Sequence, residues 1–134
     1  SSEFGRHQGL GIVDGEVVRL QEPGEGDVIL KVPQVGWNRV FKSPHQPWDG
    51  TPLEGSADGA WMYFVHSFYV KPVDPRMICA VTRYGRLEFC SSLRRGNLFA
   101  CQFHPERSGP DGLQMYRAFA RHIAQTMTQE ASSR

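Results

Sequence analysis

The chain has 134 residues, a hydrophobic fraction of 40%, a charged fraction of 22% and a net charge of +1. This length and composition fit one globular domain, and the near-neutral charge argues against nucleic acid or a membrane as a partner. No apolar run is long enough to cross a membrane, and the start of the chain lacks the pattern of a signal peptide. The cysteines show no CxxC spacing, so we expect reduced thiols, a cytoplasmic location and no metal or other cofactor.

The first half of the chain predicts short strands separated by segments rich in glycine and proline. Residues 5–15 contain several turn signals, and Val17–Leu20 and Val28–Val32 are predicted strands. Lys42–Gly59 holds three prolines and three glycines, which predicts a long irregular surface segment. Trp61–Val70 is a nearly continuous apolar and aromatic run, which predicts a strand buried on both faces near the centre of a sheet.

Two further strand-like runs, Ile78–Thr82 and Leu87–Leu93, lie on either side of a turn signal and predict a hairpin. A two-residue loop at Tyr84-Gly85 would place Cys79 directly opposite Cys90. Such a loop requires a positive φ at its tyrosine, which a bulky residue disfavours.

The end of the chain predicts one strand and one amphipathic helix. Leu98–Phe103 is the last predicted strand, and a helix is predicted from about Asp111, which suits the N-cap position. Apolar residues near helical spacing form one face of this helix, namely Leu113, Tyr116, Phe119, Ile123 and Met127. We expect one domain over residues 1–128 and a flexible tail over residues 129–134.

The candidate catalytic residues are His104 and Glu106, which follow the last predicted strand with Pro105 between them. Side chains two residues apart on an extended chain point the same way. An imidazole and a carboxylate placed like this can act as a base and the group that orients it. The proline fixes φ and has no N–H that competes for the carboxylate.

Several ordered motifs accompany this pair, namely Lys31–Asn38, Tyr63–Tyr69, Arg95–Phe99, Gln102–Glu106, and Ser108-Gly109 with Gly112-Leu113. With them the chain resembles the class I (triad) glutamine amidotransferases, in particular the subfamily of glutaminase subunits of imidazole glycerol phosphate synthase. The resemblance runs from about Gly5 to His122. It implies an α/β fold, the C-terminal part of the class I glutamine amidotransferase fold, with a mixed, mostly antiparallel sheet and a C-terminal amphipathic helix.

The resemblance also implies roles for individual residues. His104 would be the general base that activates a cysteine thiol for attack on the side-chain amide of L-glutamine, and Glu106 would orient it. Ser67 and Phe68 would lie along the glutamine pocket. The residues that would face the synthase (cyclase) partner, near the route of the ammonia, are Trp37, Asn38 and Arg107.

Some positions depart from the family pattern. Gln34 stands where His or Met is usual, Phe68 where Tyr is common, and Arg107 where Lys is usual. Arginine and lysine are both cations, but a planar guanidinium does not replace the contacts of an ammonium. Cys90-Ser91-Ser92 resembles the branch of the subfamily that serves surface-polysaccharide synthesis, so the sequence leaves open which acceptor receives the ammonia.

The largest departure is the lack of the Gly-x-Cys-x-Gly elbow that holds the family's nucleophile. Cys79 and Cys90 sit in strand-like runs, and Cys101 is three residues before His104, which puts the two side chains on opposite faces of an extended chain. We expect three buried thiols and no glutaminase activity from this chain alone. The apolar surface that the missing elements would cover favours a homo-oligomer.

Three interpretations of this sequence stay open. The chain can be a fragment of a glutaminase domain, a non-catalytic interaction or assembly module that keeps the synthase-facing surface, or one half of a split enzyme. A second chain that carries the cysteine would distinguish the split enzyme from the module.

Overall fold

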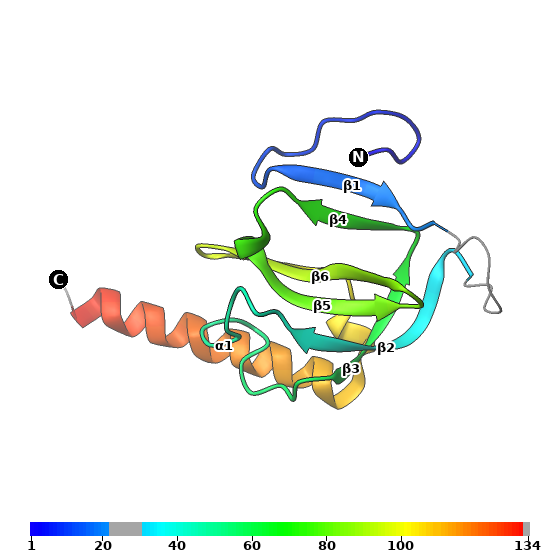
Figure 1. The fold of residues 1–134 in the computed structure, drawn as a ribbon. Coiled ribbons are helices and arrows are strands. Elements are labelled where there is room, and N and C mark those ends of the chain that lie inside the picture. Colours follow the sequence, from blue (N-terminus) through cyan, green and yellow to red (C-terminus); the bar gives the residue numbers. More distant parts are fainter. Residues whose placement is uncertain (22–30, 133–134) are drawn as a thin grey trace.

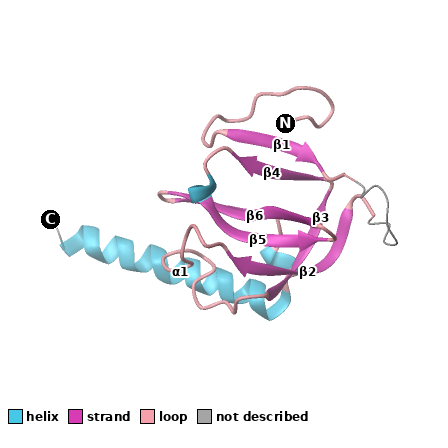
Figure 2. Cartoon of the chain, viewed as in Figure 1, coloured by secondary structure: helices cyan, strands magenta, loops and turns pink. Residues whose placement is uncertain are grey.

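The structure is a computed structural model that describes residues 1–21 and 31–132. Figures 1 and 2 show a curved sheet with one long helix lying along it, and the C-terminal half of this helix extends beyond the strands. The elements in chain order are β1 (Gly15–Arg19), β2 (Gln34–Lys42), β3 (Ala60–His66), β4 (Phe68–Pro72), the 3₁₀ helix η1 (Pro75–Met77), β5 (Ile78–Tyr84), β6 (Leu87–Arg95), β7 (Leu98–Cys101), the 3₁₀ helix η2 (Pro105–Arg107) and α1 (Gly109–Ser132).

The seven strands form one sheet in the order β1-β4-β6-β5-β2-β3, with β7 paired to β6. Each pairing among the described strands is antiparallel. Because β5 occupies one edge of β6, strands β4 and β7 share the other edge. The predicted α/β class, with a mostly antiparallel sheet and a C-terminal helix, is confirmed.

Strand β2 was not among the predicted strands. Its third residue, Gly36, has a φ of +134°, a conformation that favours glycine. The strand predicted over Val28–Val32 lies mostly outside the described residues, and Lys31 and Val32 are not in a strand. The next strand among the described residues is β2, which begins at Gln34.

The prediction of a single strand over Trp61–Val70 is wrong. The run breaks at Ser67 into β3 and β4, which pair with different neighbours. Strand β3 lies at the end of the strand order, and its residues alternate between the two faces, so that Met62 and Phe64 are buried while Trp61 is exposed. Large apolar side chains on both faces had the pattern of a central strand, but one of these faces is open.

The predicted hairpin is present as β5 and β6, with a different register. Its two-residue loop begins at Gly85 rather than at Tyr84, because glycine takes the required positive φ, here +60°, at little cost. Cys90 therefore lies opposite Val81, and the expected pairing of Cys79 with Cys90 is wrong.

The segment between β2 and β3 is irregular, as predicted, but its centre is packed inside the protein. Trp48, Thr51 and Leu53 are buried, and the indole N–H of Trp48 donates to the carbonyl oxygen of Cys79 at 2.9 Å. The expected surface location is wrong for this part. The core combines this segment with the sheet and α1, and consists of Val40, Trp48, Leu53, Ala60, Met62, Phe64, Cys79, Ala80, Phe89, Phe103 and Met115.

Helix α1 begins at Gly109, which places Asp111 in its first turn rather than at the N-cap. A carboxylate in that turn interacts favourably with the helix dipole. The helix continues to Ser132, past the domain boundary expected at residue 128. The side chains that it buries are those of Met115 and Ala118, whereas the predicted apolar face is about half exposed.

Candidate active site

The predicted pair is formed at the end of β7. His104 Nδ1 lies 2.8 Å from Glu106 Oε1, and 41% and 54% of the two side chains are exposed. The backbone N–H of Glu106 and the hydrogen bond from His104 lower the pKa of this carboxyl. Because the carboxylate accepts the Nδ1 proton, Nε2 is the ring nitrogen left to take a proton from another group.

Backbone hydrogen bonds fix this pair to the edge of β3. The N–H of His104 donates to the carbonyl oxygen of Tyr63 at 2.9 Å. Ser108 Oγ donates to the carbonyl oxygen of His104 at 2.6 Å and accepts the N–H of Tyr63 at 3.0 Å. Ser108 is almost completely buried, and its hydroxyl joins β3 to the turn that carries His104 and Glu106.

The start of α1 packs on the same turn at Gly112. A Cβ at this position would lie 1.9 Å from the carbonyl oxygen of Pro105, so only glycine allows this contact. The N–H of Gly112 also donates to the carbonyl oxygen of Ser108 at 3.2 Å. No structural role was predicted for Ser108 or Gly112 from the sequence. Their place in the motif Ser108-Gly109 and Gly112-Leu113 was the feature that could have indicated one.

His66 connects Phe68, one of the two residues expected along the glutamine pocket, to Gln34 in β2. This buried ring has Nδ1 2.8 Å from the carbonyl oxygen of Phe68 and Nε2 2.8 Å from Gln34 Oε1. Burial lowers the pKa of His66, the hydrogen bond to Phe68 opposes this shift, and the charge of His104 adds to the lowering. Both ring nitrogens face an oxygen, so a neutral imidazole, which carries one N–H, can donate to only one of these two acceptors.

The residues expected along the glutamine pocket lie at this junction. Ser67 stands between β3 and β4, and the first residue of β4 is Phe68; both side chains are partly buried. The carbonyl of Ser67 accepts the N–H of Leu20 at 2.8 Å, so hydrogen bonds hold the backbone on both sides of the junction. The part of these two residues in a glutamine pocket stays a prediction.

Two of the three residues expected at the partner interface meet around Tyr63. The Trp37 ring makes an edge contact with the Tyr63 ring at a centroid distance of 5.9 Å, and Arg107 Cζ lies 4.8 Å from the centre of the same ring. The Asn38 side chain instead donates to the carbonyl oxygen of Arg83 at 2.8 Å and so braces β2 against β5. The structure therefore groups Trp37 with Arg107 and places Asn38 apart from them.

Trp37 and Tyr63 belong to an aromatic patch on the outer face of β2 and β3. Three directly opposed pairs form it, namely Val35 with Val65, Trp37 with Tyr63, and Arg39 with Trp61. Arg39 lies over the Trp61 ring at 5.0 Å, and Val35, Trp37, Trp61 and Val65 are exposed. Exposed and buried residues alternate along β2 and β3, and this alternation could have predicted the patch. The expectation that residues 61–70 are buried on both faces prevented that prediction.

The cysteines are poor candidates for the nucleophile. Burial raises the pKa of the Cys79 thiol, that of Cys90 to about 12 and that of Cys101 to about 11. The expected burial is confirmed for the first two, while Cys101 is partly exposed. Thiols with raised pKa values are protonated near neutral pH and react slowly.

Within residues 1–21 and 31–132, no group of three or more His, Cys, Asp or Glu side chains is arranged to hold a metal ion. No helix in this described part of the chain has the length and hydropathy needed to cross a membrane.

The chain has curated relatives, although no protein-family model matches it. Subunit HisH of imidazole glycerol phosphate synthase from Rhodopirellula baltica is 44% identical over 118 residues, which are 88% of this chain and 53% of that relative. HisH of Synechococcus sp. strain JA-3-3Ab is 41% identical over 129 residues, 94% of this chain and 55% of the relative. HisH of Syntrophotalea carbinolica is 44% identical over 123 residues, which are 89% of this chain and 56% of that relative.

The chain therefore spans about half the length of the curated relatives that it matches. The order of motifs along the sequence, the mostly antiparallel sheet with its C-terminal helix, and these identities agree with one another. The resemblance inferred from the motifs is confirmed: along about nine tenths of its own length, the chain is similar to part of the HisH subunits.

Proposed function

We propose that this chain carries the general base and the orienting carboxylate of a glutaminase site, which a cysteine from a second polypeptide segment completes. The observation that carries the proposal is the contact between His104 Nδ1 and Glu106 Oε1 at 2.8 Å, which leaves Nε2 as the proton acceptor. The relatives, HisH subunits about twice as long as the matched part, support it.

In the proposed reaction, His104 Nε2 takes the proton of the cysteine thiol, and the thiolate attacks the side-chain amide carbon of glutamine. Glu106 stabilises the imidazolium that forms. The imidazolium then returns its proton to the leaving nitrogen, which departs as ammonia, and a thioester remains. Water, with His104 again as the base, hydrolyses the thioester to glutamate and restores the thiol.

The substrate is expected to lie at the β3–β4 junction, beside Ser67 and Phe68. Support comes from the hydrogen bonds of His66, which fix the carbonyl of Phe68 and so the backbone shape of the junction. Fixed backbone groups of this kind orient a bound substrate without further reorganisation.

The chain alone is expected to be inactive. Its own thiols have raised pKa values because they are buried, and a triad that lacks its nucleophile loses most of its acceleration. The test measures ammonia release from L-glutamine by the chain alone and after addition of the part of the Rhodopirellula baltica HisH subunit that has no counterpart in this chain. We expect release only from the mixture; turnover by the chain alone would contradict the proposal.

A second candidate function is a non-catalytic module that binds the synthase (cyclase) subunit. The observation in its favour is the aromatic patch, with Trp37 and Trp61 exposed and Arg107 stacked on Tyr63. Exposed aromatic and arginine side chains of this kind dominate many binding surfaces. Calorimetric titration of the chain with the cyclase subunit from Rhodopirellula baltica tests it, with Trp37→Ala expected to weaken binding and Val73→Ala, at an exposed site elsewhere, expected to leave it unchanged.

We also propose that the chain forms a homo-oligomer when no other segment covers its apolar surface, and that it works in the cytoplasm. Support comes from the half-exposed apolar face of α1 and from three free cysteines. Sedimentation velocity at micromolar concentration tests the oligomer, and a monomer would contradict it.

A further inference from the structure

The hydroxyl of Ser108 completes a hydrogen-bonded pair between β3 and the turn that carries His104 and Glu106. In an antiparallel ladder, two opposed residues of a hydrogen-bonded pair exchange both of their N–H···O=C bonds. His104 and Tyr63 exchange one directly, from the N–H of His104 to the carbonyl oxygen of Tyr63 at 2.9 Å. The other passes through Ser108 Oγ, which accepts the Tyr63 N–H at 3.0 Å and donates to the carbonyl oxygen of His104 at 2.6 Å. The hydroxyl thus extends the pairing of β3 to the residue of the proposed base.

Water does not readily replace this hydroxyl. Ser108 is 1% exposed, and the space that one oxygen atom leaves at such a closed position is too small for a water molecule. Without the hydroxyl, the N–H of Tyr63 would lose its acceptor, and the carbonyl oxygen of His104 would keep the N–H of Arg107, at 3.0 Å. The backbone of His104 would then be attached to Tyr63 by one hydrogen bond instead of two links.

The first turn of α1 holds the backbone of Ser108. The N–H of Gly112 donates to the carbonyl oxygen of Ser108 at 3.2 Å, and the N–H of Ser108 donates to the carbonyl oxygen of Pro105 at 3.0 Å. A Cβ added at Gly112 would lie 3.0 Å from Ser108 Cβ, so helix and serine are in close contact. Ser108 is therefore held from the side of the helix, while its hydroxyl reaches across to β3.

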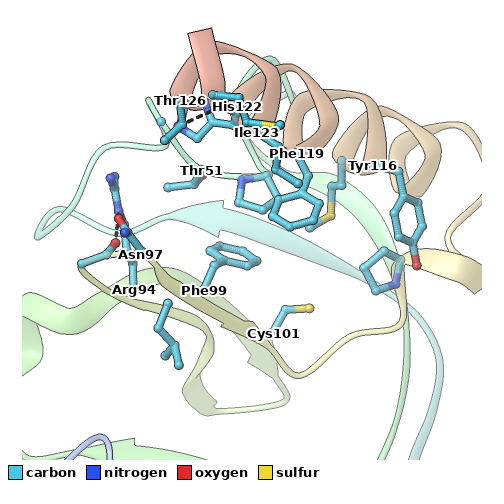
Figure 3. Close-up of a pocket in the computed structure, with 17 residues that line it drawn as sticks. Thr51, Arg94, Asn97, Phe99, Cys101, Tyr116, Phe119, His122, Ile123 and Thr126 are labelled. Atoms are coloured by element: carbon cyan, nitrogen blue, oxygen red, sulfur yellow. Dashed lines mark hydrogen bonds between the residues drawn. The ribbon is translucent and has the colours of Figure 1, made fainter. Parts of the chain in front are cut away.

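Another side of the same turn borders open space. A groove of about 720 Å³ lies between α1 and β7, and Pro105 is among the residues that line it. Figure 3 shows side chains of α1 on one wall of this groove and Phe99 and Cys101 on the facing wall. The turn is thus held by its contacts with β3 and α1, and Ser108 takes part in both.

The contact between the imidazole and the carboxylate is too exposed to fix its own geometry. The His104 side chain is 41% exposed and that of Glu106 is 54% exposed. A pair at such a position contributes little by itself, because water competes for both groups and the side chains lose freedom when they meet. A backbone that already holds both residues in the right geometry reduces this cost. The buried hydrogen bonds of Ser108 supply that geometry for His104.

We propose that Ser108 is a positioning residue for His104. By fixing the backbone of His104 on β3, its hydroxyl keeps the imidazole at Glu106 in the tautomer that carries the proton on Nδ1 and leaves Nε2 free. Ser108 acts through His104 and takes no part in the proton transfers themselves. The inference rests on the proposed function, in which Nε2 of His104 is the base, and it adds the residue that sets the geometry of that base.

The ring tautomer of His104, measured on this chain alone, tests the role. Nuclear magnetic resonance spectra that correlate ring nitrogens with ring protons distinguish a protonated nitrogen from a free one. They are recorded at about pH 8, where an ordinary imidazole is neutral, and His104→Gln assigns the signals. We expect the Nδ1–H form in the wild type. Ser108→Ala should lower the ratio of this form to the Nε2–H form about fivefold, the effect expected from the loss of one buried hydrogen bond.

Two further variants make the measurement specific to the hydroxyl of Ser108. Ser108→Cys keeps the shape of the side chain with a weaker donor, so we expect an intermediate ratio, and this variant decides if circular dichroism shows that Ser108→Ala does not fold. Ser91→Ala is the matched control, because Ser91 is 0% exposed and its hydroxyl has no hydrogen-bond partner among the described residues. The control should leave the ratio within about twofold of the wild type.

The outcomes separate the positioning role from the proposed function. An Nε2–H form of His104 in the wild type, an unchanged ratio in both Ser108 variants, or an equal fall in Ser91→Ala would overturn the positioning role. Ammonia release is measured separately, with the unmatched HisH segment, which is the part of the Rhodopirellula baltica subunit without a counterpart in this chain. A ratio that depends on Ser108 without any release would keep the positioning role and contradict the proposed function. Release together with a ratio that does not depend on Ser108 would do the reverse.

Discussion

Glu106 determines which nitrogen of His104 is free to act. Its carboxylate accepts the Nδ1 proton at 2.8 Å, and its lowered pKa keeps it charged through the neutral range. With the charge present, the tautomer with a free Nε2 is favoured, and in the proposed reaction the same charge would stabilise the imidazolium. An amide at the same place could accept from Nδ1–H or donate to Nδ1, so it would select neither tautomer.

Glu106→Gln is therefore expected to lower kcat of the completed enzyme by about 10²–10⁴-fold, with a smaller change in KM. The measurement is steady-state ammonia release by the chain mixed with the cysteine-bearing segment. Glu88→Gln, which removes an exposed carboxylate paired with Arg83 on the hairpin, is the matched control. Equal kcat values for Glu106→Gln and the control would show that Glu106 does not orient the base.

His66 makes the stability of the chain depend on pH. Its pKa in the folded chain lies below the ordinary value of 6.5, because burial disfavours the charged ring. The unfolded chain therefore binds the proton first as pH falls below about 6.5, so the free energy of unfolding falls with it, by at most about 1.4 kcal/mol per pH unit. The loss ends below the folded-state pKa.

Urea unfolding between about pH 5 and pH 7.5 measures this contribution. We expect the wild-type chain to lose stability toward the acid end more steeply than His66→Asn, which has no titrating ring at this position. Parallel curves for the two chains would show that another group is responsible.

Among the elements, the close contact of α1 with η2 positions the turn that carries His104 and Glu106. Gly112→Ala would bring a Cβ to within 1.9 Å of the carbonyl oxygen of Pro105, so helix and turn would have to separate. We expect a loss of about 1–3 kcal/mol in the free energy of unfolding, as for other overpacked contacts. Urea unfolding measures it, with Gly9→Ala as the control.

The control is informative because an added Cβ at Gly9 has no neighbour within 4 Å. It is expected to change stability by less than about 0.5 kcal/mol. If Gly112→Ala were as stable as Gly9→Ala, the close contact between α1 and η2 would not be needed for the fold.

The parts of the fold that local patterns specify could be predicted from the sequence. The β5–β6 hairpin, the strand before His104 and the C-terminal helix follow from residue type and period alone. The contact between His104 and Glu106 was predicted, but for a different backbone: the prediction assumed an extended chain, whereas Glu106 lies in the 3₁₀ helix η2 with His104 at its N-cap.

The burial of each strand or helix face depends on which distant elements cover it. A local sequence pattern does not contain this information. The aromatic run was taken for a central strand, but Trp61 and Val65 lie on the open face of a strand at the end of the order. The apolar stripe of α1 was correctly found, yet Phe119 and Ile123 are half exposed. The grouping of Ser108 with Tyr63 depends on a contact between residues 45 positions apart.

In the whole molecule, the catalytic turn lies between two exposed surfaces. Pro105 belongs to the groove beside α1, while Arg107 stacks on Tyr63 in the aromatic patch. The two residues of the catalytic pair, His104 and Glu106, alternate with them along the chain. The turn that carries the proposed base therefore lies between an apolar groove and the aromatic patch.

The reactivity of the added cysteine tests the central claim most directly. Alkylation by iodoacetamide, followed by mass spectrometry so that each thiol is assigned, is measured across pH for the unmatched HisH segment alone and with this chain. We predict that the chain lowers the apparent pKa of the nucleophile and raises its reactivity at neutral pH about tenfold or more, because a thiolate beside an imidazolium is favoured. The increase should be lost with His104→Gln; an equal increase with this variant, or none with the wild-type chain, would contradict the account.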